Sequence, residues 1–534
     1  MLRVASTLCK WYHKQKEDRQ SMKKTTLSRR WYYWLLPIVA GLSPIVIYSG
    51  FAQTRTFDVR DFGAKADGKS LDSPAINKAI EAAAKVGRGT VSFPAGTYLA
   101  GSIHLRSNIT LDLEAGSVIL GAPEGTHAFD APEPNPFDAY QDFGHSHWHN
   151  SLIWGENLEN IAIVGEGIIN GGGLSRGTGN TPVPDGDGNK TIALKLCRNI
   201  LFRDFTIAHG GHFAYLLTGC DNVTMDNLKI DTNRDGIDLD CCRNVRVSNC
   251  AVNSPRDDAI CPKSSYGLGF KRATEDVTIT NCLVSGFDEG SMLDGTFKGG
   301  GGTGRIKFGT ESNGGFKNIT VSNCVFDHCL GLAIESVDGG DIDGISVSNI
   351  TMRECLNSPI FIRLGNRARG PDNPAPGIVR NVNISDLTVV GASTKSASII
   401  AGIPGHDIDH VRISNVRIIV NGGGTKDMIS IVPPEQEKEY PEPGRFGTMP
   451  AYGFFCRHVE SIQFNNVDLA FASQEQRPAF VLNDVRKAEF YFLKTQTSGI
   501  GAPNFHLNNV TDFTLDYSLG MTPTKGDFPK ETSF

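Results

Sequence analysis

The chain has no excess of positive charge and no residue spacing typical of a metal or nucleotide site. Lysine and arginine number 52 against 58 aspartate and glutamate, a net charge of −6, so nucleic acid is a poor partner. None of the 12 cysteines stands in a CxxC pair of the kind that holds zinc. The glycine-rich run 299–304 is not followed by Gly-Lys-Ser/Thr, which excludes a phosphate loop there. We therefore expect no cofactor.

The N-terminal segment is different in kind from the rest of the chain. Two basic pairs precede an apolar run at residues 31–48, and small residues stand where a cleavage site before Gln53 would need them. This pattern predicts a secretory signal over residues 1–52. The charged region ahead of the apolar run is long for a signal, so Met22 is a candidate true start.

An uncleaved N-terminal anchor is the alternative to a signal peptide. The apolar run approaches membrane-spanning length, although Pro37 and Pro44 interrupt it. With either outcome residues 53–534 lie outside the cytoplasm, secreted or periplasmic. A membrane is a partner only if the segment stays attached.

Short alternating runs rich in β-branched residues recur along the chain, each opened by Asn or Asp. They begin at Asn199, Asn222, Asn244, Asp276, Asn318 and Asn381. Each predicts a strand entered through a turn. The shortest period, roughly 22 residues, leaves room for about three short strands, whereas common helical repeats are longer. We therefore predict an all-β fold, a single right-handed parallel β-helix over residues 53–534.

Two further segments are expected at the ends and edges of this solenoid. Asp72-Ser73-Pro74 and the alanine-rich residues 75–85 predict a helix with proline at its first position, which would cap the open N-terminal end of the β-helix. Residues 432–452, dense in proline, glutamate and aromatics, predict a long loop that helps shape the binding face.

Three Ser/Thr-Asn-Cys tripeptides, at 248–250, 280–282 and 322–324, repeat at the close of successive strands. They predict ladders of inward-facing thiols and amides in a narrow core. The alternative for the cysteines is a disulfide, with Cys324 to Cys329 or Cys355 as the nearest possible bridges.

Carboxylates recur at the same spacing as the coils. Asp235 and the pair Asp257-Asp258 are separated by about 22 to 23 residues, which places them on neighbouring coils about 4.8 Å apart. Like charges so close cannot all ionise easily, so one of them keeps its proton to higher pH. A turn-capping role is the alternative, and it suits Asp238 and Asp240 better than Asp235.

Several strings in order along the chain resemble glycoside hydrolase family 28, the polygalacturonase family. They are Asp61-Phe62-Gly63-Ala64, residues 93–98 (Phe-Pro-Ala-Gly-Thr-Tyr), residues 161–173, Asp235-Gly236-Ile237-Asp238 and Asp257-Asp258-Ala259-Ile260. The resemblance implies a pectinase-type β-helix that hydrolyses a glycosidic bond with inversion. By similarity, Asp257 is the general acid, and Asp235 and Asp258 hold and deprotonate water.

The chain departs from the family at two places. Where the family's Gly-His-Gly is expected the chain has residues 285–290, without histidine but with Asp288. The family's Arg-Ile-Lys aligns with Ala333-Ile334-Glu335, and Arg305-Ile306-Lys307 lies one coil too early, so we interpret that string as a coincidental match. Plain homogalacturonan is therefore less expected than a modified or different acidic glycan.

Basic residues near the Asp side chains are the candidates for substrate binding. Arg305 and Lys307 alternate along a predicted strand and share one face. With Lys263 and Arg363 they would form a cationic subsite for a uronate or sulfated sugar, to which we add Asp288 as a polar candidate. Salt-bridged surface positions are the alternative for each basic residue.

The cluster His145-Ser146-His147-Trp148-His149 allows three interpretations. Alternate histidines on a strand would share a face and suggest a metal site, but the repeat places no further ligand beside them. Trp148 would suit stacking on a sugar ring, and His149 is a candidate for the substrate wall. An unrelated surface is the third possibility.

We therefore expect a secreted glycoside hydrolase that cleaves a pectic or related acidic polysaccharide without metal. A β-helical polysaccharide lyase is one alternative, with Lys263 or Arg305 as the base and the Asp side chains holding metal. A noncatalytic glycan-binding protein is the other.

Overall fold

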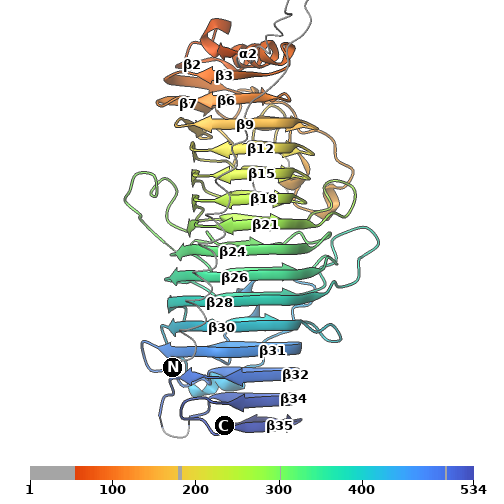
Figure 1. The fold of residues 1–534 in the computed structure, drawn as a ribbon, viewed down its shortest axis with the longest axis vertical. Helices are drawn as coiled ribbons and strands as arrows, with labels where there is room; N and C mark the ends of the chain where they lie inside the picture. Colours follow the sequence, from red (N-terminus) through yellow and green to blue (C-terminus); the bar gives the residue numbers. More distant parts are fainter. Residues whose placement is uncertain (1–54, 178–182, 301, 500–501) are drawn as a thin grey trace, which may run out of the picture. The chain divides into compact units, whose positions relative to one another are not determined.

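Parallel strands stacked in register form most of the regular structure in the described residues (Figure 1). The computed structural model describes residues 55–177, 183–300, 302–499 and 502–534. One 30-stranded and one six-stranded sheet wind into a right-handed parallel β-helix. The predicted all-β solenoid is therefore confirmed. Residues 1–52, where we expect the signal or anchor, lie outside the described residues.

The repeated Asn-Val/Ile runs form the main wall of the solenoid. Ile200, Val223, Val245, Val277 and Ile319 stand opposite one another on five consecutive strands, and each is buried in the core. The strands are β12 (Arg198–Arg203), β15 (Asp221–Asp226), β18 (Arg243–Ser248), β21 (Thr274–Thr280) and β24 (Phe316–Asp327).

The asparagine that opens each run explains why the coils turn where they do. Asn199, Asn222, Asn244 and Asn318 have φ between 53° and 57°, a left-handed conformation that asparagine tolerates better than most residues. Their amides also form a ladder, since Asn222 Nδ2 donates to Asn199 Oδ1 at 2.8 Å.

A second wall carries the candidate site. It begins as the six-stranded sheet of β5 (Ile103–His104), β8 (Ser151–Glu156), β11 (Lys190–Lys195), β14 (Phe213–Thr218), β17 (Asp235–Asp240) and β20 (Ile260–Lys263). Further coils continue it through β23 (Lys307–Phe308), β25 (Leu332–Ser336), β27 (Ile360–Leu364) and β29 (Ser398–Ala401).

The remaining strands complete the coils. Toward the N-terminus they are β1 (Thr56–Asp58), β2 (Asp67–Leu71), β3 (Gly89–Phe93), β4 (Gly96–Ala100), β6 (Ile109–Leu113), β7 (Ser117–Gly121), β9 (Glu159–Gly165) and β10 (Ile168–Asn170), followed by β13 (Thr206–Ala208), β16 (Lys229–Asp231), β19 (Ala251–Asn253) and β22 (Leu283–Ser285). Toward the C-terminus they are β26 (Ile342–Arg353), β28 (Val379–Ala392), β30 (Asp409–Val420), β31 (Phe454–Phe471), β32 (Phe480–Tyr491), β33 (Lys494–Thr495) and β34 (Phe505–Asp516).

Both ends of the stack are covered. Helix α2 (Ser73–Lys85) begins with Pro74 in its first turn and buries Ile76 and Ile80 against the first coils, as predicted (Figure 1). At the other end, β35 (Thr524–Phe528) and β36 (Thr532–Ser533) return antiparallel to β34. Such a reversal blocks the open strand edge against further pairing.

The predicted ladder of inward-facing thiols and amides is confirmed for the thiols only. Cys250, Cys282 and Cys324 are buried, and all cysteines in the described residues are free thiols, so no bridge joins Cys324 to Cys329 or Cys355. The expected inward amides are wrong, because Asn249 and its equivalents are exposed. Their left-handed φ near 55° turns the chain at the corner and points the amide outward.

Within the described residues, no helix has both the length and the apolar character needed to cross a membrane. The predicted loop 432–452 lies between β30 and β31 and contains the 3-10 turn η5 (Pro443–Phe446), whereas the turn η4 (Lys426–Ser430) precedes it.

Candidate active site

Strand pairing brings three aspartates together at one edge of the second wall. Ile237 pairs with Ile260, which sets Asp235 beside Asp258 on the next coil, and Gly236 N donates to Asp258 O at 3.0 Å. Oxygen atoms of Asp235, Asp257 and Asp258, called the Asp trio below, all lie within 4.8 Å of one another. This spacing follows directly from the coil separation.

Two cations hold Asp258 as an anion. Arg305 Nε donates to Oδ1 at 2.8 Å, and Lys307 Nζ lies 3.3 Å from Oδ2. Burial alone would raise the pKa of Asp258, but Lys307 and Arg305 outweigh it and hold the pKa below its usual range. Asp258 is therefore ionised at neutral pH.

Asp235 has the opposite environment. Its side chain is buried, and Oδ1 has no hydrogen-bond partner. Burial, followed by the charges of Asp238 and Asp257, raises the pKa of Asp235 well above its usual value. The opposite directions of the two pKa shifts favour a proton on Asp235 and not on Asp258.

Asp257 is the member of the trio that reaches solvent. Its side chain is 24% exposed, whereas Asp235 and Asp258 are buried. Oδ2 accepts hydrogen bonds from Arg234 Nε at 3.2 Å and Nη2 at 2.7 Å, and Oδ1 accepts from the Asp258 amide at 3.1 Å. Sequence reasoning missed Arg234, because nothing in its spacing marks it.

Arg305-Ile306-Lys307 lies on the coil between Asp258 and Ala333, one coil before Ala333-Ile334-Glu335 as predicted. Even so, Arg305 and Lys307 both contact Asp258. They do not form the open cationic subsite that we expected, since both are buried and the predicted loop covers them through Glu442 and Tyr440. Their ion pairs raise the pKa of each cation well above normal despite burial.

Glu335 shows how crowded this charge cluster is. It occupies the position where the family's lysine was expected and lies 3.9 Å from Lys307. Burial raises the pKa of Glu335 to about 8, so it is mostly neutral at pH 7. Asp258 is thus the principal anion that Lys307 neutralises inside the protein.

Lys263 belongs to a neighbouring buried network. Its Nζ lies 3.9 Å from Asp238 Oδ2 and 3.5 Å from Glu311 Oε2. Burial would lower the pKa of Lys263, but these carboxylates hold it well above normal. A lysine so firmly protonated is unsuited to abstract a proton, which counts against the lyase alternative. Lys263 is also too buried to be an open substrate subsite.

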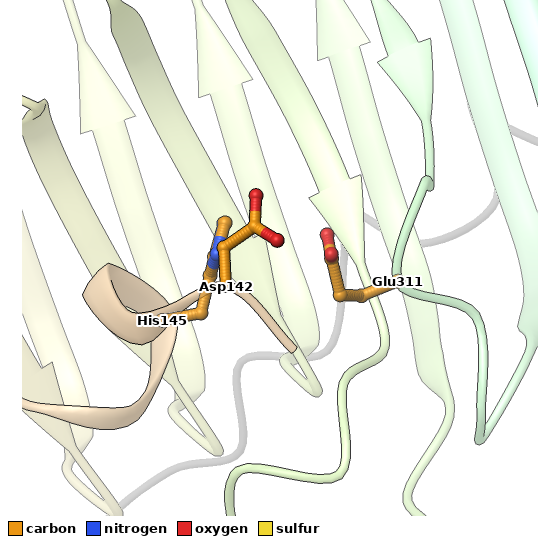
Figure 2. Close-up of side chains that lie close together, drawn as sticks. All are labelled: Asp142, His145 and Glu311. Atoms are coloured by element: carbon orange, nitrogen blue, oxygen red, sulfur yellow. The ribbon is translucent and has the colours of Figure 1, made fainter. Parts of the chain in front are cut away.

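The same network contains a cluster that resembles a metal site. Asp142 and His145 approach Glu311 from the loop that includes η3 (Phe143–Ser146) (Figure 2), with ligand atoms within 4.8 Å of one another. However, Arg369 bridges the two carboxylates, at 3.1 Å from Asp142 Oδ1 and 2.6 Å from Glu311 Oε1. An arginine in this position supplies the positive charge that a metal would supply.

The histidine-rich segment does not form the strand that we expected. His145 Nε2 lies 3.2 Å from Asp238 Oδ2 in the interior, and Trp148 is buried with its indole N–H on Thr218, so it cannot stack on a sugar. His149 stacks on Trp154 at 3.9 Å just before β8. That is three strands from β17, or about 14 Å from the trio.

Two other substrate-binding candidates also lie apart from the trio. Arg363 is buried and donates to backbone carbonyls, including Gly402 O at 2.9 Å and Glu435 O at 2.7 Å; it anchors the loop before β31. Asp288 is exposed after β22, and among the described residues no hydrogen bond or ion pair joins it to the trio.

A cavity of about 840 Å³ opens on the N-terminal side of the trio. Its lining includes Gly171, Gly172, Arg176 and His209, and His209 N bonds the backbone of Asp231 in the turn that leads to Asp235. A hydrogen bond to Glu289 raises the pKa of His209. Sequence reasoning missed this cavity because separate loops form it.

Comparisons with known proteins agree with this architecture. The model of "Glycosyl hydrolases family 28" matches residues 124–438, and that of "Rhamnogalacturonase A/epimerase, pectate lyase-like" matches residues 56–181. A probable polygalacturonase of Vitis vinifera is 26% identical over 379 residues, covering 67% of this chain and 73% of that protein. An exo-poly-alpha-D-galacturonosidase of Dickeya chrysanthemi is 24% identical over 433 residues, covering 69% and 68%.

Among solved structures, the family 28 exopolygalacturonase of Yersinia enterocolitica superimposes with a TM-score of 0.59 at 19% identity, covering 87% of this chain and 79% of that one. This likeness concerns the fold alone. The family model spans more than half of the chain, so the protein belongs to glycosyl hydrolase family 28 and is a glycoside hydrolase.

Proposed function

We propose that this protein hydrolyses glycosidic bonds in a pectic or related acidic polysaccharide, with the Asp trio as its catalytic residues. The observation that carries the proposal is the contrast between the surroundings of two carboxylates in contact range. Arg305 and Lys307 contact Asp258 and lower its pKa, whereas burial without a hydrogen-bond partner on Oδ1 raises the pKa of Asp235. Such a pair supplies both a base and a proton-bearing group at one point.

Each residue of the trio has a distinct part in the proposed reaction. Asp258 accepts a proton from water as the water oxygen bonds the anomeric carbon. Asp257, at the exposed edge, donates a proton to the glycosidic oxygen as the carbon–oxygen bond breaks. Asp235 holds the attacking water through its carboxyl group. Acid–base assistance of this kind accelerates reactions by about 10²–10⁴-fold.

Water, and not a carboxylate, is the proposed nucleophile. Both oxygens of Asp258 are engaged by cations, which leaves it a poor nucleophile toward carbon. The oxygen separations within 4.8 Å are shorter than the roughly 6.5–9.5 Å usual for inverting enzymes, so stereochemistry needs its own test. Proton NMR of the first product should show the inverted anomer, and a retained anomer would refute direct attack by water.

The substrate class rests on the relatives and on the cationic residues near the trio. Relatives named for polygalacturonan cleavage cover about two thirds of the chain. Arg234 beside the trio and Arg176 and His209 in the cavity offer positive charge that is partly open to solvent, which suits a uronate-rich chain. The polysaccharide is the proposed partner.

A polysaccharide panel tests the proposal. Polygalacturonate, rhamnogalacturonan and algal uronates are incubated with the protein, and reducing ends and ultraviolet absorbance are followed together. We expect new reducing ends without absorbance, and an Asp258→Asn variant should lose at least about 10²-fold in rate. Asp343→Asn, which alters a partly exposed carboxylate on β26 away from the trio, is the matched control. Unsaturated products alone would indicate a lyase instead.

We also propose that the folded part acts outside the cytoplasm, on the sequence pattern of residues 1–52. Sequencing the N-terminus of the mature protein should find Gln53 first. Full-length protein retained in the membrane fraction would support an anchor.

A further inference from the structure

Arg234 stands between the solvent and the residue proposed as the proton donor. It lies in the turn before β17, one coil from Asp257, and its Nε and Nη2 both donate to the single oxygen Asp257 Oδ2, at 3.2 and 2.7 Å. Each side chain of this pair is 24% exposed. The contact is thus a partly exposed ion pair in which only one carboxylate oxygen accepts from the guanidinium. It is weaker than a bidentate pair that uses both oxygens.

This ion pair conflicts with the chemistry asked of Asp257. A carboxylate that accepts two hydrogen bonds from arginine is an anion, whereas a general acid must carry a proton before it can donate one. Asp257 cannot serve as the donor while Arg234 holds it.

The other cations of the site cannot leave their partners as easily. Arg305, Lys307 and Lys263 are all buried and each contacts at least two carboxylates. Arg234 is the more exposed cation. Asp257, Asp235 and Asp142 surround it and raise its pKa against the effect of burial. His212 also lies nearby, and burial together with the charge of Arg234 keeps the pKa of His212 well below normal. The cavity lined by Gly177, which contacts His212, opens on this side.

We propose that Arg234 is a latch displaced by substrate: it pairs with Asp257 in the free enzyme and moves to a carboxylate of the incoming acidic sugar, which frees Asp257 to take up the proton that it donates. The inference rests on the proposed function and deepens it. Once Arg234 has left, Asp257 loses the cation that favours its ionised form, and the neighbouring anion of Asp258 favours its protonation.

The proton account closes over one cycle. One proton enters from solvent onto Asp257 as the uronate binds. It passes to the glycosidic oxygen as that bond breaks, and Asp258 receives a proton from the attacking water. Asp258 then releases its proton to solvent, and product departure returns Arg234 to Asp257.

Substrate discrimination gives the first test. Wild type and Arg234→Gln are compared on polygalacturonate and on the same polymer with its carboxylates reduced to alcohols. On the acidic polymer the variant should lose about 10- to 100-fold in kcat/KM, the value of one charge-assisted hydrogen bond. On the neutral polymer its kcat should rise, because Asp257 is no longer held. A fall on both polymers would indicate a merely structural residue, and no change on either would also refute the latch.

A matched control exists elsewhere in the chain. Arg380 places Nε and Nη2 on the single oxygen Asp343 Oδ2, at 2.9 and 2.8 Å, on exposed strands away from the site. Arg380→Gln should leave the preference for the acidic polymer unchanged. Arg234→Lys keeps the charge and should retain most of that preference.

Calorimetry tests the latch without catalysis. Trigalacturonate is titrated into the protein near pH 6 in two buffers of different ionisation enthalpy. We expect close to one proton taken up per molecule bound by wild type, and none by Arg234→Gln or Asp257→Asn. Absence of binding, or binding without proton uptake, would overturn the inference. If wild type binds with proton uptake but cleaves no polysaccharide, the proposed function fails and the latch stands.

Discussion

Replacing Lys307 by methionine should shift the pH profile of the enzyme toward higher pH. Lys307 Nζ lies 3.3 Å from Asp258 Oδ2 in the interior. At an effective dielectric constant of about 20, this separation corresponds to about 5 kcal/mol of attraction. The interaction favours the ionised form of Asp258 and lowers its pKa.

The sign of the effect follows from the role of Asp258 as base. The base works only when ionised, so activity falls as pH drops through its pKa. Without Lys307 that pKa rises, but Arg305 still donates to Oδ1. We therefore expect the acidic midpoint of kcat/KM to move up by about 1 to 3 pH units. Glu335, with a pKa of about 8, is mostly neutral and adds little opposing charge.

The assay is the initial rate of reducing-end release from pH 3 to 9, run as a series at low substrate concentration. Lys307→Arg keeps the charge and should keep the wild-type profile. Lys494→Met, which removes a lysine from an exposed pair with Asp468, is the matched surface control. An unchanged acidic midpoint in Lys307→Met would refute the assignment of Asp258 as the base.

Three further outcomes are expected. Asp235→Asn resembles the neutral carboxyl group in shape and charge, so the unfolding free energy should change by less than about 1 kcal/mol in urea titrations. Activity should fall by about 10²–10⁴-fold, because an NH₂ group in place of the carboxyl O–H holds the attacking water differently. A large loss of stability would show that Asp235 is ionised. Glu311→Gln removes one of the two carboxylates that contact Lys263 and one of the two that contact Arg369, and it should cost up to about 3–5 kcal/mol at pH 7. Cations hold the pKa of Glu311 well below normal despite burial. Its contribution to stability is therefore present above the pKa of the unfolded chain and is lost as pH falls through the pKa of the folded protein. The difference in unfolding free energy between variant and wild type should thus shrink in acid. Asn222→Ala, at φ 54°, should destabilise by about 1–2 kcal/mol and Asn222→Gly by less, as thermal melts would show; equal costs would argue that the amide ladder matters more than the backbone.

The repeat in the sequence was enough to predict the solenoid and the assembly of the trio. Asn222 and Asn244 mark equivalent corners, and each coil adds a fixed rise, so residues one period apart must be neighbours. Asp235 and Asp258 lie side by side for that reason alone. The corner conformation also explains why Asn249 was wrongly predicted to face inward. The repeat shows that an asparagine recurs at this position, but its left-handed φ directs the amide outward.

The surroundings of the trio could not be predicted, because irregular loops supply them. His145 reaches Asp238 from a loop more than 90 residues earlier in the chain, and Glu442 reaches Arg305 from more than 130 residues later. No period links such positions. The contact of Arg305 and Lys307 with Asp258 does follow from the coil on which they lie, since Ile306 pairs with Ile260, but their burial under the later loop could not be predicted.

The central claim is that the trio adds water across a glycosidic bond. Polygalacturonate digested in water that carries a heavy oxygen isotope tests it most directly, with the fragments weighed by mass spectrometry. We predict one solvent oxygen at the new reducing end of each cleaved bond, and no cleavage by Asp258→Asn. Unsaturated fragments without solvent oxygen, or equal cleavage by the variant, would contradict the claim.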